Sequence, residues 1–223
     1  MSANIIKHFI ETRDFNYGSV KEKLNEIMDE HTKKACVMLN INLVNIIIWP
    51  NSDAVIPETG EGGQVWSKEL VMIYIDPSRS VAELQKIIET QIPATIYHEL
   101  NHIARGNFLS KEELGFHHNL SKAVISEGIA SYFAHEKWSQ AQMPWTKYSE
   151  TEIQDLLSIY LSRDISDDDQ YDHEKWFYGT GDLPRWIGYK LGYYFVERYK
   201  KQNPNVSWSD IIKLKDHEFM KTV

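Results

Sequence analysis

The sequence has a single cysteine and fewer basic than acidic residues, and each of these features argues against a class of protein. A single cysteine, Cys36, rules out an intrachain disulfide and suits a reducing compartment. The 24 Lys and Arg residues are outnumbered by 32 Asp and Glu residues, which gives a net charge of −8. This balance argues against nucleic acid or an anionic membrane as the main partner.

Long apolar runs are also missing. Neither residues 1–14 nor any later segment contains a run long enough for a signal peptide or a transmembrane helix. We therefore expect a cytoplasmic protein without a membrane partner. With 223 residues, 42% of them hydrophobic, the chain is long enough for one globular domain with two lobes.

The run His98–His102 reads H-E-L-N-H and matches the H-E-x-x-H pattern of zinc hydrolases. Residues four apart share one face of a helix, so His98 and His102 can offer ring nitrogens to a single metal ion. Zinc accepts such nitrogens, and a catalytic site keeps one position open for water. Glu99 is placed to accept a proton from that water. The motif predicts Zn²⁺ as cofactor, His98 and His102 as ligands, and Glu99 as the catalytic base.

The residues around this motif predict the helix that it needs. Pro93 suits a first helical turn, and Gly106, directly after the cation Arg105, suits the end of a helix. Apolar residues recur at helical spacing, nearly opposite the two histidines. They are Ile92, Ile96, Leu100 and Ile103.

Two histidines leave a zinc site short of one protein ligand, and the position of that ligand decides the class of enzyme. A metzincin would continue with Gly three residues and His six residues after the second histidine, where this chain has Arg105 and Phe108. Asp182, in G-T-G-D, stands one residue too close for the aspartate-type pattern G-T-x-x-D. His117 and His118 stay open, since a loop could bring either one back to the metal.

Glu127 is the better candidate for the third ligand. It is a carboxylate in an otherwise apolar helix, which is costly unless the charge is paired or bound to a metal. Ala123, Ala130 and Ala134 lie on the same face and would allow a close approach to the His98/His102 helix. A structural salt bridge is the alternative role of Glu127.

These residues carry a resemblance to a known family. The run HELNH, followed about two dozen residues later by S-E-G-I-A around Glu127, resembles the gluzincin pattern of thermolysin-like and aminopeptidase-like metallopeptidases. More closely, the chain resembles the bacterial YjaZ-like family of predicted zinc-dependent proteases. The shared landmarks are Gly62-Gly63, the HExxH helix, the E-G-x-A helix and Pro184–Tyr193. The resemblance implies that His98, His102 and Glu127 are ligands and that Glu99 is the base.

The helix expected at Pro184–Gln202 supplies a further candidate group. Gly188 and Gly192 cost about 1 kcal/mol each relative to alanine inside a helix, which indicates a close backbone approach. Hydrolysis needs a donor to the oxyanion, and a tyrosine hydroxyl suits that role. In aminopeptidase-like gluzincins the catalytic Tyr precedes a Gly by three residues, as Tyr189 precedes Gly192. We prefer Tyr189 as the donor, with Tyr193 and Arg185 as alternatives. In the purely structural alternative, the tyrosines are core residues whose hydroxyls have hydrogen-bond partners of their own.

The rest of the chain predicts an α+β fold. We expect strands at Val44–Ile48 and Leu70–Ile75 with a loop over 51–67 between them. We expect helices over 19–39, 81–90 with Ser80 as N-cap, 119–138, 151–162, 184–202 and 208–220.

Together these expectations describe a single zincin-like domain of residues 1–223. A small N-terminal sheet with helices (about 1–108) would face an all-helical C-terminal lobe (about 109–223) across a zinc cleft. The predicted function is a zinc-dependent peptidase whose peptide or protein substrate adds to the strand Leu70–Ile75. A zinc protein that binds peptides without hydrolysis and a zinc-dependent amidohydrolase of small molecules are the alternatives. The presence of Glu99 speaks against the first of these, because a structural zinc needs no base.

Overall fold

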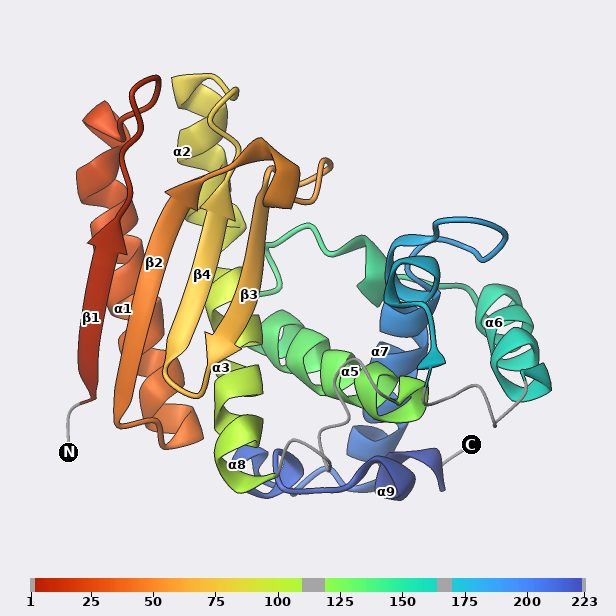
Figure 1. The fold of residues 1–223 in the computed structure, drawn as a ribbon. Helices are drawn as coiled ribbons and strands as arrows, with labels where there is room; N and C mark the ends of the chain where they lie inside the picture. Colours follow the sequence, from red (N-terminus) through yellow and green to blue (C-terminus); the bar gives the residue numbers. More distant parts are fainter. Residues whose placement is uncertain (1–2, 110–118, 164–169, 222–223) are drawn as a thin grey trace. The chain divides into compact units, whose positions relative to one another are not determined.

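The computed structural model describes residues 3–109, 119–163 and 170–221 (Figure 1). It is an α+β protein, with one mixed four-stranded sheet and otherwise helices. The chain forms two compact units. One consists of Met1–Ala104 with Phe133–Gln142, and the other of Arg105–Tyr132 with Met143–Val223.

The sheet belongs to the first unit and has the strand order β1-β2-β4-β3. Its strands are β1 (Asn4–Phe9), β2 (Leu43–Pro50), β3 (Glu61–Ser67) and β4 (Leu70–Ile75). Strands β1, β2 and β4 are parallel, and β3 forms an antiparallel hairpin with β4. Since β4 is paired with β2 on one side and β3 on the other, it has no edge for a substrate. The prediction that a peptide adds to Leu70–Ile75 is therefore wrong.

Two of the four strands were not predicted. The N-terminal strand β1 lies at one edge of the sheet, and its burial alternates only between exposed and half-buried. Strand β3 contradicts the expected loop over 51–67, because E-G-G-Q-V-W-S contains two glycines and few apolar residues. It is a strand because its backbone pairs with β4 from Glu61 to Ser67.

Three helices accompany this sheet, lying behind it in the view of Figure 1: α1 (Lys21–Leu39), α2 (Val81–Thr90) and α3 (Ile92–Phe108). The predicted start of α2 is confirmed. The Ser80 side chain accepts a hydrogen bond from the Glu83 N–H, and the Glu83 carboxylate accepts one from the Ser80 N–H.

Helix α3 carries the predicted apolar stripe, and its four members are fully buried: Ile92, Ile96, Leu100 and Ile103. The helix does not end at Gly106, however, but continues to Phe108. Gly106 does not adopt the left-handed conformation of a helix-ending glycine, and the Leu109 N–H still bonds to the Arg105 carbonyl at 2.9 Å.

One histidine of α1 is buried against Tyr97 of α3. His31 of α1 is 2% exposed, its Nδ1 lies 3.1 Å from the Tyr97 hydroxyl, and its ring packs against Trp138 with 4.7 Å between centroids. Burial lowers the pKa of His31, with a smaller opposing contribution from the Glu30 charge. The folded protein therefore holds this imidazole neutral at a pH where the unfolded chain would protonate it.

We expect this histidine to make the fold sensitive to acid. Because the folded-state pKa is lower than the unfolded value of about 6.5, the free energy of unfolding should decrease as the pH falls below about 6.5. Urea unfolding of the wild type and of His31→Phe at pH 8, 6.5 and 5 measures this. The variant should lose less stability on acidification than the wild type does. Equal losses in the two proteins would show that other groups cause the acid sensitivity.

The second unit is helical throughout its described part. Its helices include most of α5 (Leu120–Lys137), α6 (Glu150–Ser162), α7 (Ile187–Gln202), α8 (Trp208–Ile211) and α9 (Asp216–Met220), with a short 3-10 helix at Pro144–Thr146 and a short π-helix at Glu174–Tyr178. The segment 208–220, predicted as one helix, is two short ones. Helix α7 begins three residues after the predicted Pro184, because Trp186 has a φ of +66° and cannot continue a helix.

The two glycines of α7 mark close approaches, as predicted. A Cβ atom on Gly192 would lie 2.0 Å from the Val124 carbonyl oxygen and 2.9 Å from the Gly128 Cα, both on α5. A Cβ atom on Gly188 would lie 2.7 Å from the Phe177 ring. The backbones of α5 and α7 are therefore in direct contact at Gly192. No residue larger than glycine fits at this crossing.

None of the described helices combines the length and the apolar character that crossing a membrane requires.

Candidate metal centre

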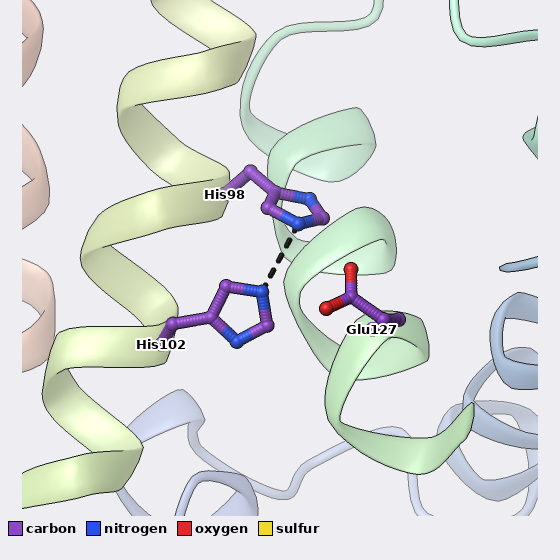
Figure 2. A group of neighbouring side chains, drawn as sticks. All are labelled: His98, His102 and Glu127. Atoms are coloured by element: carbon purple, nitrogen blue, oxygen red, sulfur yellow. Dashed lines mark hydrogen bonds between the residues drawn. The ribbon is translucent and has the colours of Figure 1, made fainter. Parts of the chain in front are cut away.

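His98 and His102 present their ring nitrogens to one another from successive turns of α3. Their Nε2 atoms are 3.1 Å apart, and both side chains are half-buried (Figure 2). Two nitrogens bound to one tetrahedral zinc ion, each at about 2.0–2.1 Å, lie about 3.4 Å apart. The pair is thus at nearly the spacing that a shared metal ion requires.

Glu127 of α5 completes a group of three possible ligands. Its side chain is 4% exposed, and its carboxylate is turned toward the two rings in Figure 2. One ligand atom from each of His98, His102 and Glu127 lies within 4.8 Å of the other two. Within 3–109, 119–163 and 170–221, no other group of His, Cys, Asp or Glu side chains has this spacing. Two imidazoles and a carboxylate are a ligand set of catalytic zinc.

The other candidates for the third ligand are placed differently. Asp182 is exposed and does not belong to the group. His117 and His118 lie outside the described residues.

Glu99 is held against the backbone of β3. Its side chain is 6% exposed, and a Cβ atom on Gly63 would lie 2.5 Å from its Oε1 atom and 2.6 Å from its Cγ atom. Any side chain at position 63 would therefore displace the carboxylate. The neighbouring Gly62 is restricted as well, because a Cβ atom there would lie 2.3 Å from the Ala54 carbonyl oxygen. The two glycines leave room for Glu99 and for the loop beside the strand.

Tyr189 lies among aromatic rings of the helical unit. It is half-buried, and its ring centroid lies 5.2 Å from Trp145, 5.1 Å from Phe177 and 5.8 Å from Trp186. Tyr193, one turn later, is buried against Tyr132. The role of either tyrosine as oxyanion donor stays a prediction.

Arg185, the other alternative, has an exposed side chain. Its guanidinium carbon lies 4.5 Å from the Trp186 ring centroid. This stacking suits a cation–π contact.

One acidic residue near the site was not predicted. Glu61 of β3 is 6% exposed, and its Oε2 atom accepts a hydrogen bond of 2.6 Å from the Thr95 hydroxyl. Burial raises the pKa of Glu61, while hydrogen bonds from Thr95 and Thr59 and the attraction of His98 act in the opposite direction. The sequence signal was an acid two residues before Gly63, but the segment looked like a surface loop, where acids are common.

Comparisons with known proteins agree with the resemblance found in the sequence. Residues 24–221 match the family described as "Predicted Zn-dependent protease (DUF2268)". The "Uncharacterized protein YjaZ" of Bacillus subtilis (strain 168) is 30% identical over 112 residues, which cover 48% of this chain and 42% of that protein. The match thus spans less than half of the relative. No solved structure matches the chain.

Proposed function

Because the chain belongs to the family of predicted Zn-dependent proteases, we propose that it is a zinc-dependent peptidase that hydrolyses peptide bonds. The observation that carries this proposal is the group of His98, His102 and Glu127, with Glu99 directly following the first ligand. A zincin-like arrangement is part of the proposal. Its support is the contact between strand β3 and the helix that bears the motif.

The proposed ligands differ in what they supply. His98 and His102 would hold the metal through their Nε2 atoms, and Glu127 would add a carboxylate oxygen from a buried position. When bound, zinc supplies a Lewis acid that activates water and polarises the scissile carbonyl. A set of three protein ligands leaves a coordination position for that chemistry, unlike the closed set of four in a structural site.

Glu99 is the proposed general base. Its carboxylate takes the proton of the attacking water and later gives it to the leaving amine. The close contact with Gly63 limits the positions that this carboxylate can adopt. A base held in one place avoids the cost of ordering it during the reaction.

The outer edge of β3, where no other strand of the described residues pairs, is the proposed place of the substrate backbone. The start of this strand is covered, because the Ile56 N–H bonds to the Glu61 carbonyl and Ala54 lies against Gly62. From Gly63 to Ser67 the strand is the last of the sheet. A peptide that pairs with this segment gains main-chain hydrogen bonds irrespective of its sequence. It would also lie next to Glu99, which contacts Gly63.

The test of the function is hydrolysis by zinc-loaded protein. The protein is incubated with a mixed peptide library, and new termini are identified by mass spectrometry, with Glu99→Gln as the inactive reference. Cleavage by the wild type alone supports the peptidase. Binding without cleavage would favour the non-hydrolytic alternative. Turnover of small amides but not of peptides would favour the amidohydrolase.

Tyr189→Phe tests the proposed oxyanion donor. Removing the hydroxyl should lower kcat about 10²–10³-fold with little change in KM, as expected for a donor that acts in the transition state. The melting temperature should stay near that of the wild type, because the ring and its packing remain. Steady-state kinetics with a cleaved peptide measures this effect.

Tyr193→Phe is the matched control on the same helix. If only this variant is impaired, the donor lies one turn further along α7. If both variants keep full activity, another group holds the oxyanion and this face of α7 is structural.

A further inference from the structure

Glu61 is a buried acid for which the proposed mechanism has no use. It is 6% exposed and accepts a hydrogen bond of 2.6 Å from the Thr95 hydroxyl. Burying a carboxylate is costly, and one hydroxyl donor offsets only part of the lost hydration. The carboxyl group also lies near enough to His98 for the two groups to affect each other electrostatically.

Two contacts place β3 along the face of α3 that bears the site. Residues two apart point to the same face of a strand, so Glu61 and Gly63 face the same way. Residues four apart share one face of a helix, so Thr95 and Glu99 do too. Glu61 bonds to Thr95, and Gly63 contacts Glu99. Strand β3 therefore runs beside the part of α3 from Thr95 to Glu99. His98, the first ligand, belongs to this part of the helix.

We propose that Glu61 is a positioning residue of the metal centre, which acts on His98. This inference rests on the proposed zinc function. His98 turns Nε2 toward His102, so its remaining ring nitrogen is directed away from the metal position. Metal-binding histidines are commonly oriented by a carboxylate in an outer shell, which also makes the imidazole a stronger ligand. Thr95 fixes the carboxylate from a position one turn before His98 on the same helix.

The proposal makes metal affinity depend on a residue that does not bind the metal. Replacing Glu61 with glutamine keeps the size of the side chain and an oxygen that can accept the Thr95 hydrogen bond. It replaces the second carboxyl oxygen with an NH2 group, which carries no charge and cannot accept a hydrogen bond from His98. Zinc affinity should therefore fall, whereas the metal-free fold should change little.

The experiment compares full-length wild type, Glu61→Gln and Glu69→Gln. Glu69 is an exposed acid in the β3–β4 hairpin and serves as the matched control. Zinc affinity is measured by competition with a chelator, the ligand field by the visible spectrum of the cobalt-substituted protein, and stability by melting of the metal-free protein. We expect Glu61→Gln to bind zinc about 10–100-fold more weakly with a changed cobalt spectrum. The control should equal the wild type.

The outcomes separate this inference from the proposed function. A wild type that binds no zinc overturns the metal centre and the inference with it. A wild type that binds zinc, with Glu61→Gln binding within twofold and showing the same cobalt spectrum, overturns the inference alone. Should Glu61→Gln fail to fold, Thr95→Val replaces it, because it removes the hydroxyl that holds the carboxylate. An unchanged zinc affinity in that variant also overturns the inference.

Discussion

Glu99→Gln is expected to retain zinc and the fold but to lose peptide hydrolysis. Glutamine has nearly the same volume as glutamate and fits against Gly63, yet it cannot accept a proton from water. Removal of a general base typically costs about 10²–10⁴ in rate. Initial rates on a cleaved peptide, zinc content and melting temperature should be measured on the same preparation.

The control for this variant is Glu89→Gln, which makes the same chemical change at an exposed position of α2. It should keep full activity. If Glu99→Gln hydrolysed peptides as fast as the wild type, the base would be another group and the proposed mechanism would be wrong.

Removal of the ligands should give the second large effect. Purified wild type should contain one zinc ion per chain, and the double variant His98→Ala/His102→Ala should contain none. Glu127→Ala should weaken zinc binding more than about 100-fold, beyond the usual effect of a residue that only supports a ligand. Elemental analysis and chelator competition measure these effects.

Asp182→Ala is the control for the carboxylate, because Asp182 is exposed and outside the ligand group. It should bind zinc like the wild type, and so should His117→Ala and His118→Ala. Full zinc occupancy in the double histidine variant would refute the site. Zinc loss in one of the control variants, with retention in Glu127→Ala, would place the chain outside the gluzincin class.

The features that could be predicted from the sequence are those that are encoded locally. The cap at Ser80 and the buried stripe of α3 depend on residues within a few turns of the same helix, so their spacing is visible in the sequence. The spacing of His98 and His102 is local in the same sense. The crossing at Gly192 was also visible, since glycine inside a helix is costly without a reason.

The features that were missed depend on partners distant in the sequence. Strand β3 has little strand character of its own and is defined by its pairing with β4. The burial of Glu61 follows from that strand, because only the pairing brings its carboxylate to Thr95. The predicted start of the helix at Pro184 was wrong, because Trp186 has a left-handed backbone conformation. No local sequence pattern predicts that conformation.

The backbone contact of α5 with α7 has a consequence for how substitutions in this protein will behave. Gly128, whose Cβ position would lie 2.2 Å from the Gly192 carbonyl carbon, directly follows Glu127. A larger residue at Gly192 would displace the turn of α5 from which that carboxylate projects. In a mutational screen, such a change in α7 would be recorded as a defect in metal binding, although Gly192 offers no ligand. The atoms that such a side chain would meet are backbone atoms of α5, so no change of a side chain in α5 would relieve the clash, and Gly192 and Gly128 should both stay glycine.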